Sequence, residues 1–352
     1  MVRDTGCVVG CKLGLVDDDA LVREQEDTMK HEPVSLNNGF GALFDDVTVE
    51  HLNDEGFQRR AFEQWQQAGG LLVVRGPELA DLPPQALVDW SEVFGLVERE
   101  NMTGREASMV AGYPVMRIGN IKDASGKRRA SFSKVPALQC DADVRYDPST
   151  RRPVWHTDST FRKSPPIGSV FHCKQAPPSG GETLFANTQA AYAALDDADK
   201  RRFDGLEAVC SQAHHDKKIN SYSPSYPVLS AQQRAANPAR RVPLVLAHPV
   251  SGKPALYGLN SSTCAIVPKG ESIPEERMDR YDLDGVEDDS VMILRDLLPF
   301  MTGPDFTVRW RWQPGDVVVW DNRCTIHAAT GYDDERHPRE MWRLTLLDRA
   351  HN

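Results

Sequence analysis

The pattern of apolar and polar residues predicts helices near the start of the chain and strands over most of the remainder. Apolar residues at helical spacing predict helices over 49–67 and 83–94, and Gly69 and Gly70 end the first of them. Between these helices, the apolar run 71–75 predicts a short buried strand.

From residue 154 onward, short apolar or alternating runs are separated by turns that contain Pro and Gly, which is typical of strands. Strands are expected at 115–118, 154–161, 167–173, 182–186, 206–212, 242–248, 254–258, 305–312, 316–320, 324–329 and 341–348. Helices are expected at 187–195 and 287–300. This order predicts a mainly β protein with flanking helices, built as a sandwich or barrel.

The polar composition of residues 1–34 predicts an extension outside the globular part, either a frayed helix or a disordered segment. Residues 35–352 are expected to form a single domain. Two further polar stretches, near 213–240 and 268–286, predict loops that could cover a binding site like lids.

Composition and charge narrow the class of protein. With 352 residues, 40% hydrophobic and 26% charged, the chain is typical of globular proteins, and no apolar run reaches the length of a membrane span. A net charge of -10 argues against broad nucleic-acid binding. Seven scattered cysteines without a C-x-x-C pair, and no signal peptide, predict reduced thiols and a cytoplasmic location.

The sequence His156-Thr157-Asp158 lies in a stretch with strand character. In a strand, His156 and Asp158 would point to the same face. Two histidines and one carboxylate form the metal site of non-haem Fe(II) oxygenases, which leaves coordination positions open. The best third ligand is His327, on a later predicted strand, although a histidine there could also be an ordinary core residue.

A second His-x-Asp match, His214-His215-Asp216, shows that the short motif is weak evidence. Its polar surroundings indicate a lid or a solvated loop rather than a rigid metal-binding strand. His214, His215, Tyr222 and Tyr226 are therefore candidates for a lid over the site, and an exposed polar loop explains them at least as well.

Cations that could hold a carboxylate follow His327. Arg339 and Arg343 are four residues apart at the start of a predicted strand, and arginine binds carboxylates in a bidentate manner. Upstream, Gly180-Gly181 forms a turn that leads into a strand beginning near Thr183, whose hydroxyl can donate a hydrogen bond. Taken alone, both arginines could equally lie on the surface.

Together these segments resemble the taurine dioxygenase-like (TauD/TfdA-like) family of Fe(II)- and 2-oxoglutarate-dependent dioxygenases. The similar segments are Trp-His-Thr-Asp-Ser-Thr-Phe at 155–161, Pro-Ser-Gly-Gly-Glu-Thr-Leu-Phe-Ala-Asn at 178–187, Arg-Trp-Gln-Pro-Gly-Asp at 311–316 with the run through His327, and Arg-Glu-Met-Trp-Arg at 339–343. The order of these segments along the chain and the spacing between them agree with the family, in addition to their composition.

The resemblance implies a double-stranded β-helix, a jelly-roll or cupin-like core with helices outside. It implies that His156, Asp158 and His327 bind Fe(II), and that Thr183 and Arg339 bind 2-oxoglutarate. Arg343 would meet either the substrate's anionic group or the cosubstrate. The implied reaction uses O2, converts 2-oxoglutarate to succinate and CO2, and oxidises a substrate C–H bond by hydroxylation, desaturation or ring closure.

The substrate is expected to be a small anion, such as a carboxylate, an amino acid or a sulfonate, with Lys134 as a further candidate contact. The resemblance also makes a homo-oligomer possible. Two alternatives stay open at this point: a non-catalytic jelly-roll protein that binds a ligand, and a zinc hydrolase that uses the same histidines and aspartate. Neither nucleic acid nor membrane is expected as a partner.

Overall fold

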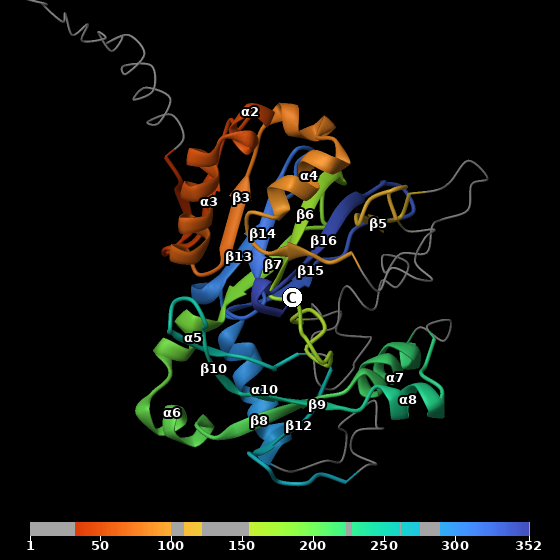
Figure 1. Ribbon diagram of the computed structural model, residues 1–352. Coiled ribbons are helices and arrows are strands. Elements are labelled where there is room, and N and C mark those ends of the chain that lie inside the picture. Colours follow the sequence, from red (N-terminus) through yellow and green to blue (C-terminus); the bar gives the residue numbers. More distant parts are fainter. Residues whose placement is uncertain are drawn as a thin grey trace, which may run out of the picture. The chain divides into compact units, whose positions relative to one another are not determined.

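The computed structural model describes residues 32–99, 109–121, 155–222, 227–260, 262–274 and 289–351 (Figure 1). Residues Pro33–Asn352 form one compact unit. Almost all of the predicted extension 1–34 lies outside the described residues, as do Lys134, Tyr226 and the end of the predicted 268–286 loop.

The largest element is an eight-stranded sheet in the order β1-β2-β3-β14-β6-β16-β4, with β5 also paired to β16. Its only parallel pair among the described strands is β2 with β3. The strands are β1 (Val34–Asn37), β2 (Phe40–Phe44), β3 (Leu71–Val74), β4 (Leu96–Val97), β5 (Met116–Gly119), β6 (Gly168–Gln175), β14 (Val317–Asp321) and β16 (Glu340–Leu347).

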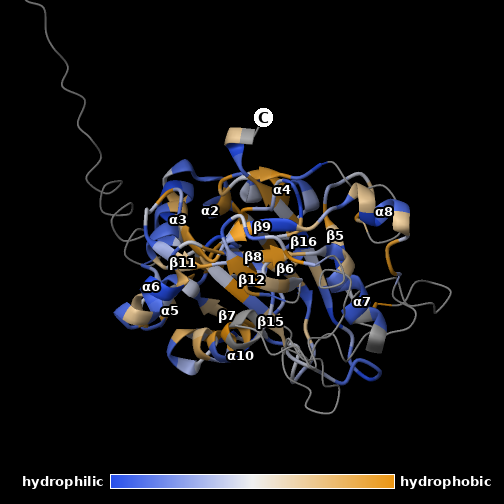
Figure 2. Cartoon of the chain, turned by 90° about the horizontal axis from the view of Figure 1, so that it is seen from below, coloured by the Kyte–Doolittle hydropathy of each residue, from blue (hydrophilic) through white to orange (hydrophobic). Residues whose placement is uncertain are grey.

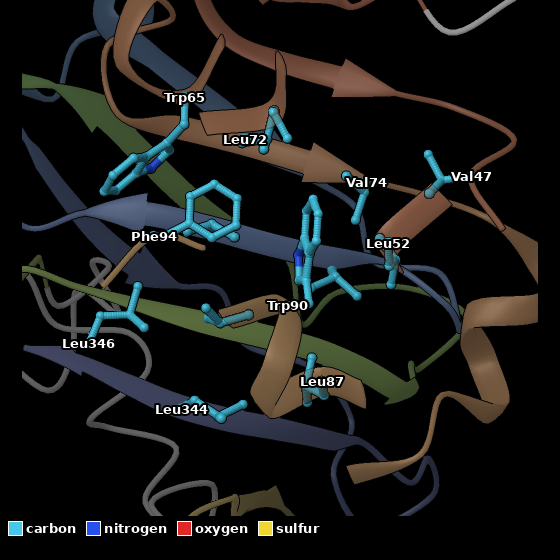
Figure 3. Close-up of a cluster of buried hydrophobic side chains, with 14 of the residues drawn as sticks. Val47, Leu52, Trp65, Leu72, Val74, Leu87, Trp90, Phe94, Leu344 and Leu346 are labelled. Carbon is cyan, nitrogen blue, oxygen red and sulfur yellow. The ribbon is translucent and has the colours of Figure 1, made fainter. Parts of the chain in front are cut away.

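Helices cover one face of this sheet through a core rich in aromatic rings (Figure 3). They are α2 (Val49–Asn53), α3 (Glu55–Gln67) and α4 (Pro84–Ser91), with the 3-10 helix η1 (Pro77–Asp81) beside them. Trp65 and Trp90 each pack edge-on against Phe94, with ring centroids 5.3 Å apart in both pairs. These rings are buried against strand residues such as Leu72 and Leu344.

The single helix predicted over 49–67 is in fact two helices. Asp54 ends α2 in an extended conformation, and its carboxylate accepts a hydrogen bond from the Phe57 amide at 2.6 Å, which caps α3. Aspartate is a favourable N-cap because its oxygen satisfies an amide that has no partner within the helix. The apolar spacing is continuous across the break, so it could not reveal the cap.

A second, three-stranded sheet has the order β13-β7-β15. Its strands are β7 (Thr183–Asn187), β13 (Thr307–Trp310) and β15 (Thr325–Ala329). Phe185 and Trp310 from this sheet share a buried cluster with Val73, Val318 and Trp320 from the large sheet. The two sheets therefore pack against each other through apolar side chains, on the face of the large sheet opposite to that of the aromatic core.

The rest of the described chain forms a further layer beside these strands (Figure 1). It contains a sheet in the order β12-β8-β9, a hairpin of β10 and β11, and helices. The elements are α5 (Thr188–Ala194), α6 (Asp197–Phe203), β8 (Leu206–Cys210), α7 (Gln212–Tyr222), α8 (Ala231–Ala236), β9 (Arg240–Pro243), β10 (Val245–Ala247), β11 (Pro254–Leu256), β12 (Thr263–Pro268), α10 (Asp289–Met301) and the 3-10 helix η5 (Pro304–Phe306). A last 3-10 helix, η6 (Arg349–His351), follows β16, and Arg349 donates to the carbonyl oxygen of Val93 just after α4.

Hydropathy follows this layering. In Figure 2, β8 and β12 are largely hydrophobic, whereas α3 and α6 are largely hydrophilic. Leu294 and Leu297 of α10 join Leu244 and Leu256 in one buried cluster with residues of β7, β8 and β15. No described helix combines the length and the apolar character needed to cross a bilayer.

The mainly β composition with flanking helices is confirmed, but several local predictions are wrong or incomplete. The stretch near 213–240, expected as a lid-like loop, contains α7 and α8. Strands β1, β2, β4 and β12 and helix α6 were not predicted. Because α7 carries mostly polar residues, its sequence lacks the apolar stripe by which a helix is usually recognised.

His172, on β6, generates a prediction about pH. Its Nε2–H donates to the carbonyl oxygen of Leu79 at 2.7 Å, and its Nδ1 is buried without a partner among the described residues. Burial, together with the charge of Lys174, lowers the pKa of His172 to about 4. Protonation is therefore disfavoured in the folded state.

Because the folded pKa is below the unfolded one, the stabilisation by neutral His172 is present above about pH 6.5 and is lost as the pH falls towards 4. We expect the free energy of unfolding to fall by roughly 2 kcal/mol more between pH 7 and pH 5 than in His172→Gln, which cannot titrate. Urea denaturation at both pH values measures this difference. Equal pH slopes in the two proteins would contradict the assignment.

Candidate active site

His156 and His327 are brought together by backbone pairing. The amide of each donates to the carbonyl oxygen of the other, at 2.9 and 3.0 Å, in an isolated antiparallel bridge. The two rings lie side by side, with centroids 4.2 Å apart. His327 belongs to β15 and also contacts Trp320, with centroids 4.8 Å apart. The bridge thus sets the two imidazoles beside each other at the edge of the three-stranded sheet.

Asp158 reaches the same point by a turn, so the predicted strand at 154–161 is wrong. Residues 158–161 form a turn in which Ser159 has a φ of +49°, a left-handed conformation that is unfavourable for a non-glycine residue. The turn nevertheless places the Asp158 carboxylate with the two imidazoles: one ligand atom from each of the three residues lies within 4.8 Å of the other two.

The carboxylate of Asp158 is buried but stays charged. Arg343 Nη2 lies 2.8 Å from its Oδ1, and Ser169 Oγ donates to its Oδ2 at 2.9 Å. Burial alone would raise the pKa of Asp158, but Arg343, the two histidines and Ser169 together hold it well below its usual range. Because a carboxylate offers about four acceptor positions, these two contacts leave positions on Asp158 for a cation.

His327 provides a neutral imidazole for the same set. Burial, and next to it the charge of His156, lowers its pKa well below the usual range. Its Nε2 faces Asp158 Oδ1 at 3.9 Å, while its Nδ1 is buried without a partner among the described residues. Metal ions bind deprotonated ligands, so a neutral His327 and an ionised Asp158 are in the right protonation states. The donor set fits a divalent cation.

Thr183 and Arg339 lie on neighbouring parts of the fold. Thr183 begins β7, is buried, and accepts a hydrogen bond from Trp312 Nε1 at 3.0 Å, which leaves its own hydroxyl proton free to donate. Arg339 immediately precedes β16. Gly181, in the turn before Thr183, lies so close that an added Cβ would be 3.4 Å from Arg339 Cδ.

The guanidinium of Arg339 is buried, and its Nε has no hydrogen-bond partner among the described residues. Burial lowers the pKa of Arg339, and the groups that oppose this shift, Tyr332 and Cys173, are not carboxylates. A buried guanidinium is costly unless it is paired. Such an arrangement suits a small anionic ligand.

Arg343 is engaged with the metal-site residues themselves. Besides Asp158, its Nη2 donates to Ser169 Oγ at 3.3 Å, while its Nε has no partner among the described residues. Its partner in the strand pairing is Phe171 of β6, two residues beyond Ser169. A ligand that approaches Arg343 would therefore share this guanidinium with Asp158.

The predicted lid residues lie on α7, not on a loop. His214 is fully buried, and the His215 ring lies 6.0 Å from that of Phe161, three residues after Asp158. Burial, and next to it the charges of His156 and Lys218, lowers the pKa of His215 to about 3, so it is neutral. Tyr222 ends α7, but its side chain lies outside the described residues.

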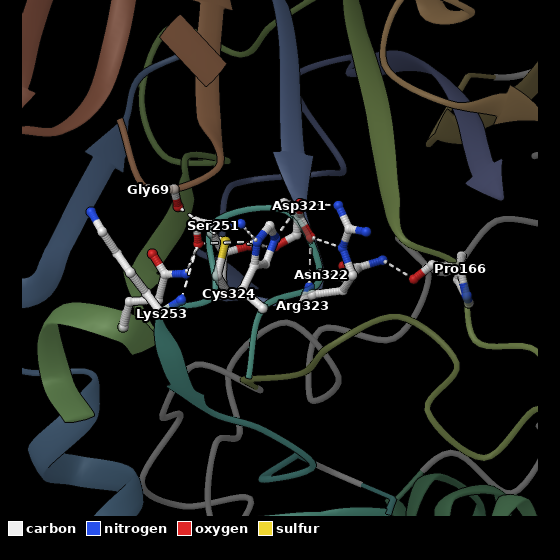
Figure 4. A network of polar contacts seen from close by, with 11 residues as sticks. Gly69, Pro166, Ser251, Lys253, Asp321, Asn322, Arg323 and Cys324 are labelled. Atoms are coloured by element: carbon white, nitrogen blue, oxygen red, sulfur yellow. Dashed lines mark hydrogen bonds and ion pairs between the residues drawn. The ribbon is translucent and has the colours of Figure 1, made fainter. Parts of the chain in front are cut away.

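A second cluster, His248, Asp321 and Cys324, also brings three possible ligands together (Figure 4). Here every acceptor position of the carboxylate is occupied. Asp321 Oδ1 accepts from the Arg323 amide and Nε, at 2.8 and 2.9 Å, and Oδ2 accepts from Arg323 Nη2 and His248 Nε2, at 2.6 and 3.0 Å. This saturated, arginine-bound network does not suit a cation.

Two residues that shape the site were not foreseen. Ser169 donates a hydrogen bond to Asp158. The only sequence signal for this role was that Ser169 shares one face of β6 with Phe171 and Cys173. Trp312 donates a hydrogen bond to Thr183, and nothing in the sequence around Trp312 indicated this contact. In both cases the partner is set by how strands pair, which a single sequence does not show.

Comparison with known proteins gives a match over most of the chain. The sequence model of the taurine catabolism dioxygenase TauD, TfdA family matches residues 31–345. An (S)-phenoxypropionate/alpha-ketoglutarate-dioxygenase from Delftia acidovorans is 29% identical over 311 residues, which cover 88% of this chain and 92% of that protein.

Other relatives match over a shorter part. An alpha-ketoglutarate-dependent 2,4-dichlorophenoxyacetate dioxygenase from Burkholderia sp. (strain RASC) is 34% identical over 200 residues, 56% of this chain and 58% of that protein. The crystal structure of AAD-2 in complex with Mn(II) and N-oxalylglycine has a TM-score of 0.68 and 24% identity, and covers 90% of this chain and 98% of that one. At this identity, the structural likeness shows the fold.

The two clusters give a prediction about metal binding. We expect His156→Gln to weaken Mn(II) binding by roughly 100-fold or more, because loss of a ligand exceeds the 10- to 100-fold cost of altering its surroundings. His248→Gln should bind Mn(II) like the wild type, because Asp321 has no position left for a cation. Titration followed by the EPR signal of free Mn(II) measures both affinities. If only His248→Gln lost Mn(II) binding, the metal site would lie at His248, Asp321 and Cys324, and the assignment to His156, Asp158 and His327 would be wrong.

Proposed function

The chain belongs to the TauD/TfdA family, and we propose that it is an Fe(II)- and 2-oxoglutarate-dependent dioxygenase that oxidises a C–H bond of a small organic anion. The resemblance inferred from the motifs is thus confirmed at the level of the family. The roles of individual residues, the identity of the metal as iron and the substrate class are parts of the proposal.

One observation supports it: a set of three possible metal ligands and a buried guanidinium with an unpaired Nε occur in the same fold. His156, Asp158 and His327 can hold a cation on one side only, which leaves positions for other ligands. Arg339, with Thr183 nearby, offers donors for a carboxylate. A zinc hydrolase has no need of the anion site, and a non-catalytic ligand-binding protein has no need of the metal ligands.

In this proposal the residues divide the work. His156, Asp158 and His327 hold Fe(II), with Ser169 and Arg343 orienting the carboxylate. Arg339 and Thr183 bind the distal carboxylate of 2-oxoglutarate. When bound, iron and 2-oxoglutarate supply the oxidising chemistry, in which decarboxylation to succinate and CO2 with O2 is coupled to C–H oxidation. The protein positions the substrate carbon and excludes water.

We infer that the core is a double-stranded β-helix. The large sheet and the sheet of β13, β7 and β15 would form its two halves, since Phe185 and Trp310 pack against Val318 and Trp320 between them. The metal residues come from both sides of this sandwich: His327 lies on β15, while Ser169 and Arg343, which hold Asp158, lie on β6 and β16.

The proposed substrate is a small anion such as a carboxylate, an amino acid or a sulfonate. The named substrates of the relatives, phenoxypropionate and 2,4-dichlorophenoxyacetate, are organic carboxylates. Arg343 lies beside the metal residues and could meet such a group. The four described cysteines are buried free thiols, which supports a reducing, cytoplasmic compartment.

Anaerobic addition of Fe(II) and 2-oxoglutarate should produce a weak visible metal-to-ligand charge-transfer band, and this band should be absent in His156→Ala. We expect Arg339→Gln to raise the Kd of 2-oxoglutarate by roughly 10- to 100-fold, since a hydrogen-bonded charge contributes about 1.5–3 kcal/mol. Titration of the band measures the Kd. The control is Arg311→Gln, an exposed arginine that donates to the carbonyl oxygen of Pro178, and it should leave the Kd unchanged.

In air, release of succinate during incubation with small carboxylates, amino acids and sulfonates tests turnover. Folded protein that binds metal but neither forms the band nor releases succinate would reject the dioxygenase and favour a zinc hydrolase or a binding protein.

A further inference from the structure

Three buried side chains next to the metal residues form a closed ring of hydrogen bonds. Asn260 Nδ2 donates to Thr160 Oγ1 at 3.0 Å, and Ser262 Oγ donates to Asn260 Oδ1 at 2.6 Å. Thr160 Oγ1 and Ser262 Oγ are 3.2 Å apart. Because Ser262 donates its proton to Asn260, Thr160 is assigned as the donor in its contact with Ser262. Within the ring, each of the three groups then donates once and accepts once.

The ring is deeply buried and anchored to the scaffold. Thr160 is 0% exposed, Ser262 2% and Asn260 5%. The Ser262 amide donates to Asn260 Oδ1 at 2.9 Å, and its carbonyl oxygen accepts from the Ser211 amide at 2.9 Å, just before α7. Hydrogen bonds in such a network strengthen one another, and a partner left unpaired there is costly. The ring therefore holds Thr160 in one place.

Thr160 lies in the turn that carries Asp158. The turn includes Ser159 with a φ of +49°, an unfavourable conformation for a non-glycine residue that persists only if its surroundings impose it. Further along, the Arg162 amide donates to the Ser159 carbonyl oxygen at 3.0 Å, and the Arg162 side chain forms an ion pair with buried Glu98. The ring at Thr160 and this ion pair thus constrain the turn on its C-terminal side, and the bridge between His156 and His327 constrains it on its N-terminal side.

We propose that Thr160, locked by its ring with Asn260 and Ser262, is a positioning residue that keeps the Asp158 carboxylate in place for the metal. The inference rests on the proposed function, since it assumes that Asp158 is a ligand. Without the ring, Ser159 relaxes to a favourable conformation and the carboxylate of its neighbour moves. A metal site needs its ligands within about 0.5 Å of the working geometry, so such a shift weakens binding.

The test compares Thr160→Val, which removes the hydroxyl at nearly constant shape, with Thr160→Ser, which keeps it. We expect the Kd for Mn(II), measured without cosubstrate by EPR of the free ion, to rise roughly 10- to 100-fold in Thr160→Val and less than about 3-fold in Thr160→Ser. The matched control is Thr302→Val. It deletes a hydroxyl that donates to Leu298 at the end of α10, and it should lower the Tm without changing the Kd.

Should Thr160→Val fail to fold, Ser262→Ala opens the ring from its other side and should also raise the Kd for Mn(II). A Tm that falls in Thr160→Val while the Kd stays at the wild-type value would overturn the proposal and leave Thr160 a purely structural residue. If the wild type binds Mn(II) but gives neither succinate nor the charge-transfer band, the dioxygenase fails while the positioning role can still be measured. Wild-type protein that binds no Mn(II) would reject both.

Discussion

The candidate site depends on keeping one carboxylate ionised inside the protein. Asp158 is almost completely buried, and burial alone would favour its protonated form, which is a poor metal ligand. The cation of Arg343, 2.8 Å away, offsets most of that cost, and His327, His156 and Ser169 add to its effect. The register between β16 and β6 sets Arg343 opposite Phe171, from where its side chain reaches Ser169, the second partner of Asp158.

This requirement explains much of the surrounding architecture. The apolar cluster between the two sheets fixes β6, β14 and β16 relative to β7 and β13, and β15 pairs with β7. The bridge between His156 and His327 then joins the ligand segment to β15 through two backbone hydrogen bonds. The aromatic core under α3 and α4 stabilises the opposite face of the large sheet, so that its strands are packed on both sides.

Most of the site could be predicted from the sequence, but for a reason that was partly wrong. His156 and Asp158 were paired on the assumption of a strand, whereas a turn with a left-handed Ser159 brings them together. The prediction rested on the types of the residues and not on the backbone conformation between them. The large strands around β14 were predicted well because uninterrupted apolar runs bounded by Pro and Gly are a strong local signal.

Features that arise from tertiary contacts were not predictable. His214 and Lys218 of α7 are polar yet buried, and a polar run gives no sign that other elements will cover it. Asn260 and Thr160 are 100 residues apart in the chain, and only the folded structure joins them. Arg339 was recognised by its spacing from His327, but its lack of a buried partner is visible only once its neighbours are in place.

The backbone bridge between His156 and His327 has a consequence for how the protein is made. The two segments are remote in the chain, so their pairing is a long-range contact that forms only as the sheets assemble. An unfolded or nascent chain therefore offers no complete ligand set. In the proposed enzyme, metal loading would come after folding rather than guide it, and metal that binds only the native protein would draw the equilibrium towards it by mass action. The lifetime of such an enzyme in the cell would then be tied to the local supply of metal.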